Sequence, residues 1–209
     1  MSISNESRSR IKKVFEPIAL GMGRAGLTPN GLTLIGFAIS IAGAALLAAQ
    51  LWVIGGIVVF VGGAFDMFDG TLARATGRAS KLGAFLDSVF DRWGEGIVYV
   101  GIVAGCVAAG YQAGAILAAA AMTSAFMVSY ARAKSEGLGF TEGTGMAAVG
   151  LAPREIRLVI LTIGLLWTGL AGGLGPLAAS LGLITILATI TIIQRILHVV
   201  NQNRKQENQ

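Results

Sequence analysis

Cysteine, histidine and charged residues are all scarce in this 209-residue sequence. The chain has one cysteine, one histidine and only 13% charged residues. A single cysteine, Cys106, excludes a disulfide within the chain and leaves no thiolate pair for a zinc site. So few charges beside 54% hydrophobic residues and a mean hydropathy of +0.72 are atypical of a soluble domain. We therefore predict an integral membrane protein, in which the lone His198 is interfacial rather than catalytic.

Long apolar runs are abundant instead. Six of them approach the roughly 20 residues that a helix needs to cross a bilayer. The N-terminal MSISNESRSRIKKVFEP has no apolar core or cleavage site, so we expect no removable signal peptide. The expected fold class is all-α, a polytopic membrane protein with six transmembrane helices in a single domain over residues 1–209. The expected spans cover residues 31–50, 51–73, 84–110, 111–132, 154–171 and 175–199.

Three of the five links between these spans carry no charge. All sixteen Lys and Arg lie elsewhere, and an even number of spans places them on one side of the membrane. The positive-inside rule makes that side cytoplasmic. We therefore expect a plasma-membrane protein with both termini, and any site beside the basic residues, in the cytoplasm. The same distribution of basic residues explains the net charge of +5, so no nucleic-acid partner is expected.

The segment before the first span, within residues 1–29, has an amphipathic pattern. Apolar residues recur at helical spacing among Lys and Arg, which favours an interfacial helix with its basic side chains toward anionic headgroups. A disordered basic leader is the alternative. Pro29 marks its end, Asn30 is expected to cap the first span, and the polar tail 201–209 is expected to fray. The apolar positions are Ile11, Phe15, Ile18, Ala19 and Met22.

Four aspartates interrupt the apolar sequence. Asp66 and Asp69 are three residues apart at the end of the second span, so they share a helix face. Asp87 and Asp91 are four apart near the start of the third span. Carboxylates this concentrated repel one another at low dielectric, and protonation or a bound cation relieves the repulsion. Hard divalent cations prefer oxygen ligands, so we predict two Mg²⁺ or Mn²⁺ ions bridged by shared carboxylates. The alternative is helix-end charges paired with Arg74, Arg78, Lys81 and Arg92.

A pattern of eight spaced residues surrounds the aspartates. It reads Asp66-x2-Asp69-Gly70-x2-Ala73-Arg74-x8-Gly83-x3-Asp87-x3-Asp91. This pattern resembles the signature of the CDP-alcohol phosphatidyltransferases. The resemblance implies a membrane enzyme that moves a phosphatidyl-type group from a CDP-lipid to an alcohol hydroxyl and releases CMP. It also implies that the four aspartates ligate metal and that Asp91 takes the proton from the acceptor. The family is commonly dimeric, so a homodimer is one expectation.

The resemblance further implies a site for the donor, either CDP-diacylglycerol or CDP-archaeol. Glycines in the signature allow the nucleotide and a facing helix to approach closely. Arg74 would reach the diphosphate, Ser80 would donate to the nucleotide, and the TPNG loop resembles the segment that lies against the CDP moiety. Capping and turn formation are the alternative for Ser80 and for this loop. The expected donor residues are Pro29, Asn30, Gly31, Gly70, Ala73, Arg74, Ser80 and Gly83.

Two features bear on the acceptor. The sequence DSVFDR at residues 87–92 resembles inositol-type members of the family, whereas glycerophosphate-transferring relatives commonly show D-P-x-A-D-K. Basic residues at three helix ends resemble those of prokaryotic phosphatidylinositol-phosphate synthases and archaetidylinositol-phosphate synthases. On that resemblance Lys134, Arg154 and Arg195 would bind the phosphate of inositol 1-phosphate. Glycerol 3-phosphate is the alternative acceptor, and we interpret Arg132 and Arg157 as topology charges that snorkel to headgroups.

A divalent-ion transporter is the alternative from another functional class. Transport sites tend to lie near the bilayer midplane on broken helices, often in repeated halves. These aspartates instead cluster near one expected face, and the sequence shows no internal repeat. We therefore favour the enzyme.

Overall fold

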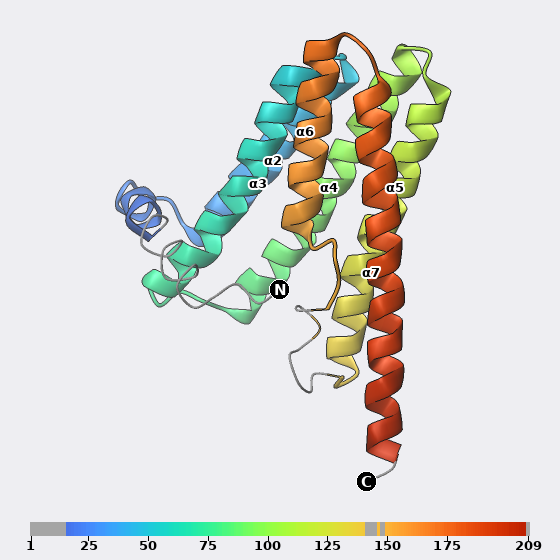
Figure 1. Cartoon of the computed structure of the whole chain (residues 1–209). Helices are drawn as coiled ribbons and strands as arrows, with labels where there is room; N and C mark the ends of the chain where they lie inside the picture. Colours follow the sequence, from blue (N-terminus) through green and yellow to red (C-terminus); the bar gives the residue numbers. More distant parts are fainter. Residues whose placement is uncertain (1–15, 141–145, 147–148, 208–209) are drawn as a thin grey trace. The chain divides into compact units, whose positions relative to one another are not determined.

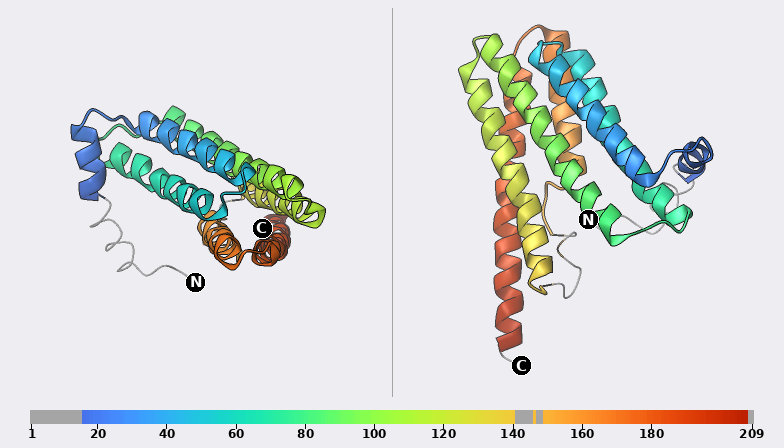
Figure 2. Two further views of the ribbon diagram at one scale, coloured as in Figure 1. Left: turned by 90° about the horizontal axis from the view of Figure 1, so that it is seen from above. Right: turned by 180° about the vertical axis from the view of Figure 1, so that it is seen from behind.

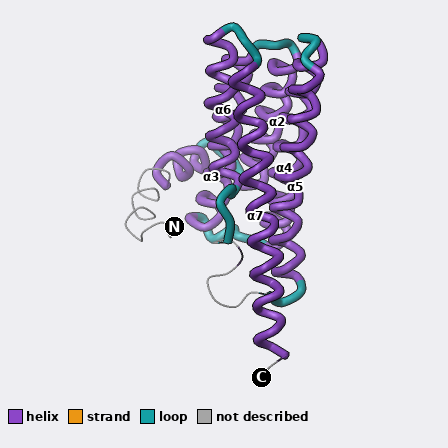
Figure 3. The backbone as a smooth tube through the Cα atoms, turned by 45° about the vertical axis from the view of Figure 1, so that its right-hand side comes forward, coloured by secondary structure: helices purple, strands orange, loops and turns teal. Residues whose placement is uncertain are grey.

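The chain is all-helical over the part that the computed structural model describes, which is residues 16–140, 146 and 149–207. These residues form helices and connecting loops without a strand (Figure 1 and Figure 3), so the predicted all-α class is confirmed. Residues 16–24 are helical and precede six longer helices. These are α2 (Pro29–Ala48), α3 (Trp52–Ala75), α4 (Lys81–Ala108), α5 (Gln112–Gly137), α6 (Arg154–Ala171) and α7 (Gly175–Glu207).

Four of the described helices, α2, α3, α5 and α7, are long and apolar enough to cross a membrane. These helices indicate a membrane protein. Large apolar side chains such as Ile116 and Leu170 are 69% and 79% exposed, which suits lipid better than water. Helix α4 carries several charges in its first half, and α6 has only 18 residues and begins Arg-Glu-Ile-Arg. Neither α4 nor α6 is among the four candidate spans, so the six transmembrane helices stay a prediction.

The chain divides into two compact units, and the first comprises residues 1–102. Within it α2 and α3 form a hairpin whose helices touch at glycines. A Cβ added at Gly43 would lie 2.7 Å from the Val59 side chain, and one at Gly55 would lie 2.6 Å from Leu47. Small residues of this kind let helix backbones approach closely in apolar surroundings.

The helical segment 16–24 runs across the ends of α2 and α3 rather than along them (Figure 2). Its Ala19 is fully buried against Leu32 and Leu72. The apolar positions Ile11 and Phe15 lie outside the described residues. The interfacial location of this segment remains a prediction.

The start of α2 differs from expectation. Thr28, in an extended conformation, is the N-cap residue, and its hydroxyl accepts a 3.1 Å hydrogen bond from the Gly31 N–H. Pro29 occupies the first helical turn, where its fixed φ is favourable and its missing N–H costs nothing. The prediction that Asn30 caps this helix is wrong, because Asn30 is already helical.

Aromatic packing places the third and fourth turns of α4 against α2. The Phe37 ring centroid lies 5.1 Å from the centroids of both Phe90 and Trp93. These two α4 aromatics flank Asp91 in the sequence. The ring contacts therefore set the position of the helical turn that carries this aspartate.

The second unit comprises residues 103–209, in which α7 packs against both α5 and α6. Helix α6 ends at Ala171, and the Gly172 that follows bonds the Thr168 carbonyl through its N–H and turns the chain out of the helix with a left-handed φ of 71°. Helix α7 continues to Glu207, so the prediction of a frayed tail is wrong for the described residues. Gln, Arg, Lys and Glu favour helix, and Asn203 donates a 2.9 Å bond to Glu207 one turn later.

Candidate active site

Asp69 is the most buried of the four aspartates, with 4% of its surface exposed. One carboxylate oxygen, Oδ2, accepts a 2.7 Å hydrogen bond from the Thr33 hydroxyl on α2. The other oxygen, Oδ1, accepts a short bond from the Gly70 N–H. Asp69 therefore points toward α2 with both of its oxygens hydrogen-bonded.

Asp66 lies one turn earlier on α3 and faces the same helix. A Cβ built at Gly36 on α2 would lie 3.0 Å from its Oδ1 oxygen. Asp66 and Asp69 thus share a face, as their spacing predicts. The absence of a side chain at Gly36 leaves room for the Asp66 carboxylate beside the α2 backbone.

Asp87, on α4, lies close enough to the other three aspartates for their charges to act on it. It experiences the negative charges of Asp91, Asp69 and Asp66, and its carboxyl group lies within hydrogen-bonding reach of Asp69. The first unit therefore brings the four predicted aspartates into one neighbourhood.

The same aspartates do not form a closed ligand shell. Over residues 16–140, 146 and 149–207, no three His, Cys, Asp or Glu side chains converge as a metal site. The donor chemistry still fits a hard divalent cation, since all four groups supply carboxylate oxygens and repel one another without a counter-charge.

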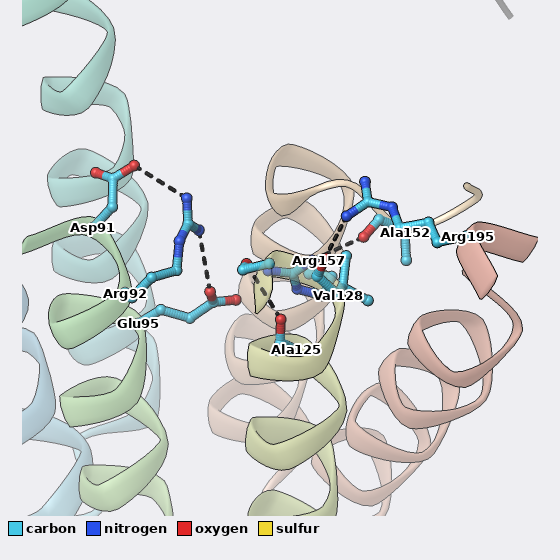
Figure 4. A network of polar contacts seen from close by, with 9 residues as sticks. Asp91, Arg92, Glu95, Ala125, Val128, Ala152, Arg157 and Arg195 are labelled. Carbon is cyan, nitrogen blue, oxygen red and sulfur yellow. Dashed lines mark hydrogen bonds and ion pairs between the residues drawn. The ribbon is translucent and has the colours of Figure 1, made fainter. Parts of the chain in front are cut away.

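Arg92 lies between two acidic side chains on α4. Its NH2 nitrogen is 3.6 Å from Asp91 Oδ2, and its NH1 nitrogen is 3.7 Å from Glu95 Oε2 (Figure 4). The ion pairing considered as the alternative for the aspartates is thus present at Asp91. It is partly exposed, with 35% of the Arg92 side chain accessible, so solvent screens it.

The predicted donor residues come from three helix ends of the first unit. The Ser80 hydroxyl accepts a 3.0 Å bond from the Gly83 N–H, which is the capping role considered as its alternative. A Cβ at Gly83 would lie 3.4 Å from Asn30 Oδ1, so the start of α2 adjoins the start of α4. The Arg74 guanidinium lies over Gly70, with NH1 3.3 Å from a Cβ built there.

The predicted acceptor residues Lys134, Arg154 and Arg195 all belong to the second unit. Arg195 is 4% exposed, whereas Lys134 is exposed and Arg154 is half-buried. The Arg195 guanidinium donates to the backbone carbonyls of Val149, at 3.1 Å, and Val128 (Figure 4). Arg195 is thus buried within the second unit, as is usual for a charged side chain in an apolar helix.

Arg157 does not behave as predicted. Only 2% of its surface is exposed, and its NH1 nitrogen donates a 2.8 Å bond to the Ala152 carbonyl (Figure 4). The prediction that it snorkels to headgroups is therefore wrong. Its charge acts on Arg195, as does that of Arg132. A position near the start of α6 suggests that the guanidinium reaches the headgroups, but in the structure it bonds the loop before the helix, at the Ala152 carbonyl.

Thr33 is the main residue that sequence reasoning misses. The available signal is a hydroxyl in the first turns of an apolar helix, where water cannot satisfy it. A helical threonine can always bond the carbonyl four residues earlier, and Thr33 does reach the Pro29 carbonyl at 3.2 Å. Its partner on α3 is therefore visible only in the structure.

Comparison with known proteins identifies the family. The model of the CDP-alcohol phosphatidyltransferase family matches residues 26–200. The archaetidylinositol phosphate synthase of Pyrococcus horikoshii is 34% identical, over 90% of this chain and 92% of its own. The crystal structure of Mycobacterium tuberculosis phosphatidylinositol phosphate synthase with CDP-DAG bound has a TM-score of 0.78 and 30% identity, covering 90% of this chain and 94% of that one. The same enzyme in complex with manganese and citrate also has a TM-score of 0.78 at 30% identity, covering 88% of each chain. The chain therefore belongs to the CDP-alcohol phosphatidyltransferase family and is an enzyme of that class.

Proposed function

We propose that this enzyme transfers a phosphatidyl-type group from a CDP-lipid to a hydroxyl of inositol 1-phosphate and releases CMP in phospholipid biosynthesis. The observation that carries the proposal is the neighbourhood of Asp66, Asp69, Asp87 and Asp91, in which Asp87 experiences the charge of the other three. The donor is CDP-diacylglycerol or CDP-archaeol. The names of the relatives, which include synthases of both lipid types, support this choice.

Two divalent ions, Mg²⁺ or Mn²⁺, would be held by the four aspartates. When bound, such ions neutralise a diphosphate and stabilise its leaving group. The complex of the M. tuberculosis enzyme with manganese supports a divalent cation in this family. The oxygen-only donor set of the present chain fits the same chemistry.

Asp91 takes the proton from the acceptor hydroxyl as that oxygen attacks phosphorus. A new phosphorus–oxygen bond forms to the acceptor, and the bond between the same phosphorus and the CMP oxygen breaks. A carboxylate within hydrogen-bonding reach of the hydroxyl is suited to this role. The Asp91 side chain retains 14% exposure, which leaves it accessible to a substrate.

The donor is held by residues at the ends of α2, α3 and α4. Arg74 contacts the diphosphate from its position over Gly70. The absence of a side chain at Gly83, beside Asn30, lets the nucleotide approach the backbone. Charge-assisted hydrogen bonds from a guanidinium suit a diphosphate. The full set is Pro29, Asn30, Gly31, Gly70, Ala73, Arg74, Ser80 and Gly83.

The acceptor phosphate is bound by Lys134, Arg154 and Arg195. The burial of Arg195, together with the positive charges of Arg132 and Arg157 that act on it, supports an anionic ligand in the second unit. A phosphorylated alcohol supplies such an anion. The chain acts in the plasma membrane with this site and both termini in the cytoplasm, and a homodimer remains the expected assembly.

Release of CMP by the purified protein tests the proposal. The protein in detergent is supplied with Mg²⁺ and either CDP-diacylglycerol or CDP-archaeol, and inositol 1-phosphate, free inositol and glycerol 3-phosphate are offered in turn. Inositol 1-phosphate should stimulate CMP release most. Stimulation by glycerol 3-phosphate alone would contradict the acceptor, and no stimulation by any acceptor would contradict the transferase.

A further inference from the structure

The side chain of Thr33 contacts a predicted metal ligand from a different helix. Its hydroxyl oxygen lies 2.7 Å from Asp69 Oδ2, and the two residues are 6% and 4% exposed. A hydroxyl carries one proton, and the Pro29 carbonyl is the more distant acceptor at 3.2 Å. Since hydrogen bonds from hydroxyl to carboxylate are short and strong, the proton belongs to the Asp69 contact.

The contact fixes the orientation of the Asp69 carboxylate. Thr33 holds Oδ2 and the Gly70 N–H holds Oδ1, so rotation about the last side-chain bond would break both hydrogen bonds. Each carboxylate oxygen has two lone pairs, and each hydrogen bond occupies one. A lone pair on each oxygen therefore remains for a cation.

The position of Thr33 is itself fixed by the fold. Its neighbour Leu32 is fully buried against Leu72, and the Thr28 cap sets the first turn of α2. A rotation of α2 that removed Thr33 from Asp69 would also expose Leu32. The packing of Leu32 and the cap at Thr28 together keep the Thr33 hydroxyl facing α3.

We propose that Thr33 is a positioning residue, which orients Asp69 for binding of a divalent cation. The inference rests on the proposed function, because it takes Asp69 as a metal ligand. Partners that orient a ligand from behind typically change metal affinity or activity by about 10- to 100-fold when they are removed. A threonine that only joined α2 to α3 would change stability and leave the metal affinity unaltered.

Binding of Mn²⁺ alone, measured by electron paramagnetic resonance on the purified full chain in detergent, tests the inference. Thr33→Val removes the hydroxyl at constant shape and should weaken Mn²⁺ binding by about 10-fold or more. Thr33→Ser keeps the hydroxyl and should restore binding. The matched control is Thr185→Val, since Thr185 bonds only its own helix, at the Leu181 carbonyl, and its replacement should leave Mn²⁺ affinity at the wild-type value.

Stability is measured on the same variants. If Thr33→Val does not fold, comparison of Thr33→Ala with Thr33→Ser isolates the hydroxyl without added bulk. Wild-type affinity in any folded variant that lacks the hydroxyl would overturn the inference, as would a loss of folding in both Val and Ala variants while Ser folds. If the wild-type chain neither binds Mn²⁺ nor releases CMP, the proposed function itself has failed.

Discussion

Asp91 combines a proposed chemical role with an ion pair to Arg92, and substitution can separate the two. Asp91→Asn keeps the size of the side chain and removes its ability to accept a proton. Because general bases typically contribute about 10²–10⁴-fold to rate, CMP release should fall at least 100-fold. Binding of the CDP-lipid, measured by calorimetry on the same preparation, should be largely retained.

Glu95 provides the matched control for Asp91. It lies on the same helix and contacts the same arginine, at 3.7 Å. Glu95→Gln should therefore reproduce any effect of disturbing Arg92 and should leave CMP release near the wild-type rate. Equal losses in the two variants would assign the effect to Arg92 and would contradict the role of Asp91 as a base.

Arg195 tests the acceptor site. Arg195→Gln should raise the KM for inositol 1-phosphate far more than the KM for the CDP-lipid, since a charge-assisted contact to phosphate is lost. Steady-state kinetics with each substrate varied in turn measures both values. Arg204→Gln, an exposed substitution on the same helix, should change neither. A parallel rise in both KM values would point to a purely structural role through the Val128 and Val149 carbonyls.

The spacing of the aspartates in the sequence is sufficient to predict which of them share a helix face. Residues three or four apart share a helix face whatever surrounds them, so the pairs Asp66 with Asp69 and Asp87 with Asp91 follow from the sequence. The partners of those carboxylates do not follow. Thr33 lies 36 residues from Asp69, and only the packing of α2 on α3 brings the hydroxyl to the carboxylate.

At the scale of the element, Thr191 on α7 holds the loop that precedes α6. Its hydroxyl oxygen accepts 3.0 Å hydrogen bonds from the N–H groups of Leu151 and Ala152 and donates to the Leu187 carbonyl. The loop passes so close that a Cβ at Gly150 would lie 2.2 Å from the Thr191 methyl group. The direction of the α6 N-terminus, which carries Arg154, therefore depends on this threonine.

Thr191→Val should destabilise the second unit. It leaves the buried Ala152 N–H without its acceptor, at a cost of about 1–3 kcal/mol, and also removes the acceptor of the part-buried Leu151 N–H. Unfolding in detergent, followed by circular dichroism, measures the loss. Thr189→Val on the same helix removes a hydroxyl that bonds only the Thr185 carbonyl and should have little effect. If the two variants unfold alike, the loop does not depend on Thr191.

The helices themselves were largely predictable, and their ends were less so. The sequence predicts a span at residues 154–171, and α6 has the same bounds in the structure, with Pro153 before it and Gly172 after it. No such signal ends α7. Apolar composition stops at Val199, but the polar residues that follow are good helix formers, so the helix continues to Glu207. Hydropathy reports the length of an apolar span, which is shorter than the helix.

At the scale of the whole molecule, the six-span topology can be tested by cysteine labelling. In a Cys106→Ser background, cysteine at Ala109 or Gly173 should react with an impermeant reagent from outside the cell. Cysteine at Lys205 should react only after the membrane is opened. These sites report on α4 and α6, the two helices whose composition is marginal for a span. Reaction of Ala109→Cys from the cytoplasmic side alone would contradict the predicted topology.

The most direct test of the account is identification of the lipid product. Purified protein, CDP-diacylglycerol, inositol 1-phosphate and Mn²⁺ are incubated together, and lipids and nucleotides are quantified by mass spectrometry. The proposed function predicts a phosphatidylinositol phosphate formed in equal amount with CMP, and loss of both products when EDTA removes the metal. CMP without that lipid, or the same yield of lipid in EDTA, would contradict it.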